Sequence, residues 1–340
     1  MKKYLVIIFI FFYYNSASGI ALFDTEFYEI KFISDNVEDT KIKKINEIKF
    51  KSINNIFNKI LVKNDFNSLK REINEDLINN FIKNIIFEDE MIINNNYYSK
   101  IKINFNPREI IAYLRNNNLK YVEFIPDNLL TIIYNKNIIE KSLLSKNNKY
   151  YNYLLSNNFK FYYLPNLDLN DRFLLNYSDI EKKNLNKINQ FGKKYNKYEI
   201  LIIISDKIDK KIIYEFFLIT NGEIYKLPNF SYNEVNYMEL FTYLKDEALD
   251  IWKIKNSIQN EITYTLNCSI QYFNLLELKE IKKNLKNILI IEKMTLLNFS
   301  YMQKHYEIKH FGNKKVLFKL FNINNLKIIQ KNNKCNISLI

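Results

Sequence analysis

The feature that most constrains the fold is a succession of strand, helix and strand between residues 97 and 123. From Lys100 to Phe105 apolar and polar side chains alternate, which is typical of a strand with one face in a core and the other in water. Asn106 is suited to cap a helix, and Pro107 fits its first position because no amide hydrogen is needed there. Three consecutive asparagines then end the helix, and we expect Leu119 to Phe124 to resume extended chain.

The first residues have the pattern of a secretory signal peptide. Two lysines precede an apolar run from Tyr4 to Tyr14, and this run of about 11 residues is too short to span a bilayer but suits a signal-peptide core. Small residues follow, so we expect export to the periplasm with cleavage after Ser18 or Gly19 and a soluble or peripheral mature protein. The alternative is an uncleaved segment that anchors the chain to the inner membrane.

The formal net charge of +13 would suit an anionic partner. Lysine, asparagine and isoleucine dominate throughout, as in proteins from A+T-rich genomes, and this bias explains dispersed lysines without a dedicated anion-binding face. Nucleic acid is disfavoured as a partner by the predicted export.

Three domains are predicted after the signal peptide of residues 1–18. Residues 19–125 read as strand, helices, strand, strand, helix and strand, the order of a ferredoxin-like split βαβ module. Its two long helices are expected at Thr40 to Leu61 and Glu75 to Ile86. Residues 126–258 are expected to form a central α/β domain, and residues 259–340 repeat the order of the first domain.

The central domain is expected to hold a mixed sheet. Its apolar runs at Leu129 to Tyr134 and Ile200 to Ile204 suit strands buried on both faces. Asn221 and Gly222 predict a hairpin turn, because both residues tolerate positive φ. Helices are expected at Asn137 to Leu155, Ser178 to Lys194 and Tyr237 to Trp252.

The overall prediction is an α+β fold in which two ferredoxin-like modules flank the central α/β domain. Residues 117–121 echo residues 324–328 at the same place in the pattern. Both duplication of a module and the biased composition explain such an echo.

The signal peptide, first strand and long helix, followed by Phe87 to Glu90 and by Tyr98 through Pro107, resemble the family described as domain of unknown function 2066, exported proteins of proteobacteria. The similarity is most specific over Phe87 to Ile133 and weaker over Leu289 to Leu326. The resemblance implies an envelope location, and it transfers no catalytic residue.

Two differences from that family are visible. Its members tend to have Phe-Asp-Pro where this chain has Phe105-Asn106-Pro107, a change that preserves the helix cap. They also tend to carry an Asn-Pro-Trp cluster where Tyr134-Asn135-Lys136 stands here, so no role of that tryptophan can be carried over.

Few residues suggest catalysis or metal binding. The histidines, His305 and His310, are five residues apart at the end of a strand, not on one face, and are interpreted as surface residues. The acidic run from Glu88 to Glu90 is interpreted as a solvated strand start, since consecutive strand residues point to opposite faces.

Cys268 and Cys335 leave two alternatives open. In a ferredoxin-like sheet the first and last strands are neighbours, which would allow a disulfide in an oxidising compartment. If Asn332 and Asn333 turn a hairpin instead, Cys335 is expected one strand further out, beyond the reach of a disulfide.

We therefore predict no catalytic residue, no cofactor and no metal site. Four glycines do not form a phosphate-binding loop, and the hydroxyl-rich run around Ser142 and Ser145 has no neighbouring histidine in sequence. The leading hypothesis is a non-enzymatic envelope protein, an adaptor or an assembly or regulatory factor, whose edge strands contact a partner protein. A binding module for an anionic lipid or envelope glycan is the alternative, and an envelope hydrolase the third possibility.

Overall fold

The computed structural model describes residues 22–340 except positions 127, 138, 140, 210, 233, 235, 259, 261, 332 and 333. The predicted signal peptide lies outside the described residues. The structure contains helices together with three β-sheets, which confirms the α+β class. The chain divides into two compact units. The first comprises Met1–Ile56, Ile73–Leu119 and Ile258–Ile340, and the second comprises Phe57–Glu72 and Lys120–Ser257. The three-domain division stays a prediction.

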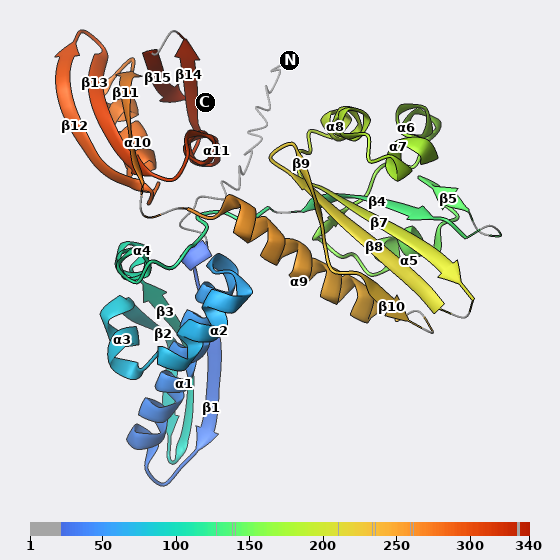
Figure 1. Ribbon diagram of the computed structural model, residues 1–340. Helices are drawn as coiled ribbons and strands as arrows, with labels where there is room; N and C mark the ends of the chain where they lie inside the picture. The colour runs from blue at the N-terminus through green and yellow to red at the C-terminus, as the bar shows by residue number, and fades with distance from the viewer. Residues whose placement is uncertain are drawn as a thin grey trace, which may run out of the picture. The chain divides into compact units, whose positions relative to one another are not determined.

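The N-terminal sheet has three antiparallel strands in the order β1-β3-β2 (Figure 1). Its strands are β1 (Tyr28–Ile33), β2 (Ile82–Ile93) and β3 (Asn96–Phe105). Alternating burial along β3 confirms the predicted half-buried strand. Its helices are α1 (Val37–Ile60), α3 (Glu75–Phe81) and α4 (Pro107–Asn116). Asn106 caps α4 as predicted, because its side-chain oxygen accepts a hydrogen bond from the Arg108 amide at 3.2 Å.

Two predictions for this region are wrong. The helix expected at Glu75 to Ile86 ends at Phe81, because Ile82, Asn84 and the residues after them pair with β3. The strand expected at Leu119 to Phe124 is absent. There, Tyr121 forms an isolated bridge with Leu61, and the Val122 amide donates to the Ile60 carbonyl at 3.0 Å. An additional helix, α2 (Lys63–Glu72), follows α1.

The central sheet is mixed, as predicted. Its main order is β10-β8-β7-β4-β5, with β6 beside β4 and β9 beside β8. β4 (Leu129–Asn135) runs parallel to β7 (Ile200–Ile208), whereas β7 and β8 (Lys211–Thr220) are antiparallel. The remaining strands are β5 (Ser142–Leu143), β6 (Tyr162–Tyr163), β9 (Glu223–Lys226) and β10 (Phe230–Tyr232). Asn221 and Gly222 have φ of 55° and 81°, which confirms the predicted turn between β8 and β9.

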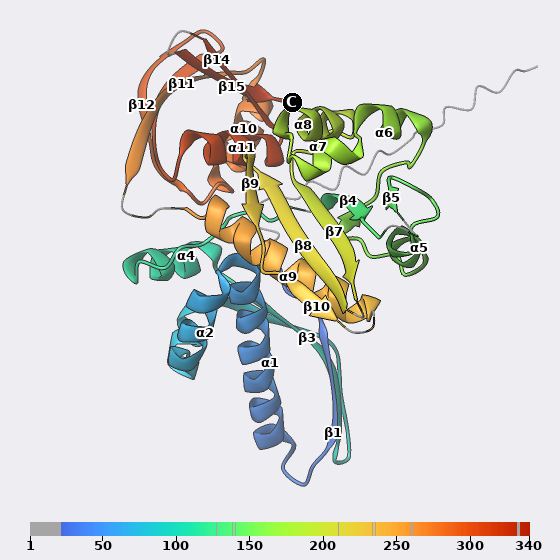
Figure 2. The same cartoon turned by 45° about the vertical axis from the view of Figure 1, so that its right-hand side comes forward.

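Helices cover both faces of the central sheet. Figure 2 shows α6 (Leu169–Leu174), α7 (Tyr177–Glu181) and α8 (Leu185–Lys194) on one side, with α5 (Lys149–Ser156) and α9 (Tyr237–Asn256) on the other. The ring contacts agree, since Tyr150 of α5 packs against Tyr214 of β8 and against Tyr237 of α9. The six buried residues that begin β4 fit this double cover.

Two helix predictions for the central domain are wrong in extent. The helix expected at Asn137 to Leu155 begins only at Lys149, because β5 pairs with the end of β4 and Asn148 caps the helix. The helix expected at Ser178 to Lys194 is two helices, since Lys183 has a positive φ and Asn184 caps α8.

The C-terminal sheet has five strands in the order β12-β13-β11-β15-β14. Its strands are β11 (Thr263–Gln271), β12 (Ile291–Ser300), β13 (Gln303–Phe311), β14 (Leu326–Lys331) and β15 (Lys334–Leu339). Helices α10 (Leu275–Lys286) and α11 (Lys314–Ile323) lie on one face (Figures 1 and 2). β15 runs parallel to β11 and antiparallel to β14, so the last strand lies inside the sheet.

The ferredoxin-like detail of the prediction is not confirmed. Such a module has four strands, whereas the described N-terminal sheet has three and the C-terminal sheet has five. The two sheets share the strand order first, third, second, namely β1-β3-β2 and β11-β13-β12.

Candidate functional site

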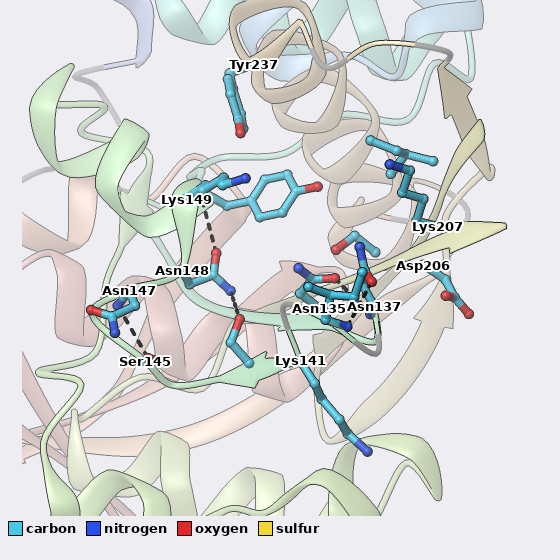
Figure 3. A pocket seen from close by; sticks show the side chains of 15 residues that line it. Asn135, Asn137, Lys141, Ser145, Asn147, Asn148, Lys149, Asp206, Lys207 and Tyr237 are labelled. Carbon is cyan, nitrogen blue, oxygen red and sulfur yellow. Dashed lines mark hydrogen bonds between the residues drawn. The ribbon is translucent and has the colours of Figure 1, made fainter. Parts of the chain in front are cut away.

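A polar cavity of about 490 Å³ lies at the carboxyl ends of two parallel strands of the central sheet (Figure 3). Asn135 ends β4 and lies in register with Ser205 of β7. After Asn135 the chain turns to β5 on one side, whereas β7 continues to Ile208 before the chain turns to β8 on the other side. Open α/β sheets bind ligands at the point where such connections diverge.

Amide and hydroxyl groups line much of this cavity. They belong to Asn135, Asn137, Ser142, Ser145, Asn147, Asn148 and Ser205. Asn148 is fixed at both ends of its carboxamide, because its oxygen accepts from the Tyr150 amide at 3.0 Å and its nitrogen donates to Ser142 Oγ at 3.1 Å. The N-terminus of α5 is thereby held at the cavity wall.

The charged lining is mainly positive. Lys141, Lys149 and Lys207 line the cavity together with one acid, Asp206. In Figure 3 the side chains of Lys141 and Asp206 extend away from the asparagines. The Lys141 ammonium lies 4.9 Å from the centre of the Tyr177 ring, which supplies a partial counter-interaction.

Ser205 is a buried polar residue of the lining whose side chain has no protein partner among the described residues. It is 2% exposed, and within the described part of the chain its hydroxyl oxygen has no hydrogen-bond partner. Buried hydroxyl groups normally bond to protein or to ordered water, so this hydroxyl marks a position where a further group is expected.

An aromatic wall closes one side of the cavity. Tyr150 and Tyr237 line it, and their rings meet edge to face with centres 5.5 Å apart. The Tyr150 and Tyr214 hydroxyls lie 3.1 Å apart, and burial raises the pKa of Tyr214 above its ordinary value of 10. Tyr214 therefore keeps a neutral phenol group beside Tyr150.

A second candidate surface is an apolar tip on the C-terminal module, formed by Phe273, Leu275, Leu276, Phe299 and Tyr301. These side chains are between 75% and 87% exposed. The end of β11 and the turn between β12 and β13 meet there, because the Tyr272 amide donates to the Met302 carbonyl at 3.2 Å. Exposed apolar groups collected in this way are typical of interaction surfaces.

The apolar tip continues into an edge strand. β12 has ten residues and pairs only with β13 among the described strands. Leu296 and Leu297 on this strand are 45% and 54% exposed. Two irregularities interrupt its register, one at the start of the strand and one just past its middle, between Leu296 and Asn298, and bulges of this kind also protect edge strands from unwanted pairing.

The C-terminal module carries most of the net positive charge of the chain. Residues 263–340 contain 13 lysines and 4 glutamates, a formal charge of +9 out of the total of +13. The module holds 13 of the 50 basic residues but only 4 of the 37 acidic ones, so its charge results from a scarcity of acids and the lysines are dispersed along the chain as predicted. Sorting the charges by module requires the module boundaries, which the structure supplies.

The structure places both histidines in β13, and one interpretation of them is wrong. His310 is 2% exposed rather than a surface residue, and burial lowers its pKa. His305 is half-buried, and its Nδ1 atom lies 2.7 Å from Ser269 Oγ. Alternation along β13 puts the two histidines on opposite faces, as predicted.

The acidic run of β2 forms ion pairs at the surface. Glu90 contacts the Lys41 ammonium at 2.9 Å and accepts from the Tyr97 hydroxyl at 2.8 Å, and the bond from Lys41 is the main reason that the pKa of Glu90 is lowered. Asp89 pairs with Lys100 at 3.1 Å. The Asp89 pair is exposed and the Glu90 pair is half-buried, so each contributes little to stability. The expectation of a strand start was wrong, because the run lies within β2, at an irregularity of its pairing with β3.

Cys268 and Cys335 form a disulfide, with their Cα atoms 4.4 Å apart. β14 and β15 form a hairpin, which the sequence argument treated as incompatible with the bond. The expectation about position was wrong, because β15 lies next to β11 and it is β14 that lies one strand further out.

The contact between Ser269 and His305 is a pairing that sequence reasoning missed. They face each other across β11 and β13, 36 residues apart in sequence, so only the strand register could have revealed them. Within the described residues, the second ring nitrogen of His305 has no partner that would orient it as a general base. This surface pair alone does not form a hydrolase site.

Two buried charges serve the packing of the second unit. Asp171 is fully buried and accepts from the Lys194 ammonium at 2.6 Å and from the Tyr195 hydroxyl at 2.5 Å. Lys253 donates to the Leu61 carbonyl at 2.8 Å, and burial lowers its pKa. Because these groups bond to protein partners, we assign them to structure.

Within the described residues, no group of three or more histidine, cysteine, aspartate or glutamate side chains could hold a metal ion. No described helix combines the length and the apolar composition needed to cross a membrane. The chain matches no protein-family model, no curated protein and no solved structure.

Proposed function

We propose that this protein is an exported, non-enzymatic adaptor or assembly factor of the cell envelope, and that its C-terminal module binds an extended acidic segment of a partner protein. The observation that carries the proposal is the exposed edge strand β12, which continues into the apolar tip. Export is supported by the signal-peptide pattern of the first residues.

The backbone of β12 supports strand addition. Its inner edge pairs with β13, and no described strand pairs with its outer edge. An extended peptide added there would gain backbone hydrogen bonds, while alternate side chains of the peptide would meet Leu296, Leu297 and Phe299. Edge strands that bind nothing are usually short or strongly charged, whereas β12 has ten residues of which two, Glu292 and Lys293, are charged.

The charge of the module favours an acidic partner. A formal charge of +9 on residues 263–340 attracts acidic segments and disfavours basic ones. The partner segment therefore combines acidic residues with apolar ones that cover the tip.

In-cell photo-crosslinking tests the proposal. A photoreactive residue at Leu297 is compared with one at Ile329, a 43% exposed residue on β14 at the opposite edge of the same sheet. We expect the photoreactive residue at position 297 to capture one protein, through a segment that mass spectrometry identifies as acidic. In a second experiment the photoreactive residue replaces Phe299, and we expect Leu297→Glu to abolish its capture of that protein. Equal capture from both edges, or no protein captured from β12, would refute the proposal.

An anionic lipid is the second candidate occupant, because lysines accompany the exposed aromatic side chains of the tip. Flotation with vesicles of phosphatidylglycerol and of phosphatidylcholine separates the two. Salt-sensitive binding to the anionic vesicles, lost in Phe273→Ser together with Tyr301→Ser, would favour lipid over a protein partner.

A further inference from the structure

We propose that the polar cavity at the carboxyl ends of β4 and β7 binds a small hydroxyl-rich anion, such as a sugar phosphate or a sugar acid. This site belongs to the second unit and is independent of the partner-binding edge of the C-terminal module.

The position of the cavity is the first argument. The connections after β4 and β7 leave in opposite directions, which opens a crevice above the pair formed by Asn135 and Ser205. Its volume of about 490 Å³ lies within the range of about 300 to 1,000 Å³ usual for small-molecule sites.

The N-terminus of α5 is the second argument. The first amides of a helix have no intrahelical partners, and the helix dipole makes this end attractive to anions. α5 has eight residues, and both its cap Asn148 and its first residue Lys149 line the cavity. Figure 3 shows Asn148 on the side of the cavity opposite Asn135 and Asn137.

Ser205 is the third and independent argument. Its hydroxyl is buried, lines the cavity and has no partner within the described residues. A hydroxyl can donate one hydrogen bond and accept others, so it suits either an oxygen of the anionic group or a sugar hydroxyl. The helix end alone would not define a site, but the helix end together with this hydroxyl does.

Charge and polarity define the ligand class. Three lysines and one aspartate belong to the lining, so the formal charge of these residues is positive. Amides such as Asn135 and Asn137 both donate and accept, as recognition of several hydroxyl groups requires. The Tyr237 ring adds an apolar surface of the kind that sugar rings cover.

Titration calorimetry on the full chain tests the inference with three probes: glucose 6-phosphate, glucose and inorganic phosphate. We expect glucose 6-phosphate to bind, glucose to bind at least tenfold more weakly, and the affinity for glucose 6-phosphate to fall as salt is added. Ser205→Ala is expected to weaken this binding about tenfold, the equivalent of one hydrogen bond to a charged group.

Ser52→Ala is the matched control, because Ser52 is also buried with an unpartnered hydroxyl oxygen but lies on α1, outside the cavity. It should leave binding unchanged. Neither substitution removes a protein hydrogen bond at the hydroxyl oxygen, and far-ultraviolet circular dichroism checks that both variants fold.

Each other outcome overturns the inference. Glucose binding as tightly as glucose 6-phosphate would refute the anion part, and phosphate binding as tightly would refute the sugar part. If none of the probes binds with a dissociation constant below about 10 mM, the site is refuted. Unchanged binding in Ser205→Ala would also refute the site, because the helix end alone does not define one.

Discussion

The N-terminal and C-terminal sheets begin alike and are completed differently. Both place the first strand beside the third and the third beside the second, with all neighbours antiparallel. In the C-terminal sheet, β15 and β14 are added on the other side of the first strand, β11. In the N-terminal sheet, no described strand occupies the corresponding side of β1.

The point of divergence can be located to a few residues. Helices α4 and α11 both have an asparagine as their C-cap, followed by a second asparagine with positive φ, Asn118 at 53° and Asn325 at 56°. The echo between 117–121 and 324–328 therefore reflects the same helix ending. After it, Leu326 begins β14, whereas Tyr121 bonds near the end of α1. Similar local signals thus lead to a sheet with or without added strands.

The largest expected effect comes from removing the disulfide with Cys268→Ala and Cys335→Ala. The bond joins residues 67 apart, and for a loop of this length the chain-entropy estimate is about 4 kcal/mol. Hydrogen exchange should become faster in β11 and β13 and remain unchanged in β1 and β3. Reduced wild-type protein serves as the control and should match the variant. Equal protection before and after reduction would show that strand pairing alone holds β15.

Matched truncations at the middle strands give the next effect. Ile101 of β3 and Ile308 of β13 are both fully buried, and replacing either with alanine should cost about 3 kcal/mol. We expect Ile101→Ala to open the N-terminal sheet further, because no disulfide restrains it. Hydrogen exchange of both sheets measures this, with Ile33→Ala at an exposed position of β1 as control. Equal opening of the two sheets would contradict the comparison.

The helix caps should give a smaller and nearly equal pair of effects. Asn106 accepts from the Arg108 amide at 3.2 Å, and Asn313 accepts from the Val316 amide at 3.0 Å. Substitution of each with alanine should cost about 1 kcal/mol, and substitution with aspartate should restore the cap. Thermal unfolding of the four variants checks this. An alanine variant as stable as wild type would show that the corresponding cap contributes nothing.

The smallest expected difference between the two sheets is the dependence of their stability on pH. It concerns the C-terminal sheet, because both histidines of the chain lie in β13. Burial lowers the pKa of His310 below its ordinary value of 6.5, so between these two pKa values the unfolded chain binds more protons. The contribution of His310 to stability is therefore complete above 6.5 and is lost as the pH falls through the lowered pKa. The Tyr264 ring and Lys314 line the same cavity as His310 and form its surroundings.

Hydrogen exchange between pH 7.5 and pH 5, corrected for intrinsic rates, tests this expectation. His310→Gln should remove the loss of protection on acidification, whereas His305→Gln should retain it. A pH dependence that survives His310→Gln would assign the effect to other groups.

Local signals in the sequence predicted much of the fold. Alternation from Lys100 to Phe105, the cap at Asn106 and the turn at Asn221 and Gly222 all depend on residues within a few positions of one another, and all are confirmed. The helix expected at Asn137 to Leu155 failed because a two-residue strand pairs with β4, and apolar spacing does not register such short pairing.

The candidate sites were harder to predict, because each depends on contacts between distant segments. Ser205 follows a buried apolar run, but its position opposite Asn135 depends on parallel pairing across about 70 residues of chain. Ser269 and His305 likewise meet through register alone. The apolar tip combines a loop after β11 with the turn after β12, and neither segment shows a pattern by itself.

The interior position of β15 has a consequence for biogenesis. A chain that emerges from a ribosome or a translocation channel releases β11 long before β15, so one edge of β11 stays unpaired until residues up to Leu339 are available. The sheet therefore cannot form strand by strand in the order of the sequence. The intermediate with an unpaired edge of β11 is suited to capture by a chaperone. Oxidation of Cys268 with Cys335 is expected to be the step that commits the assembled sheet.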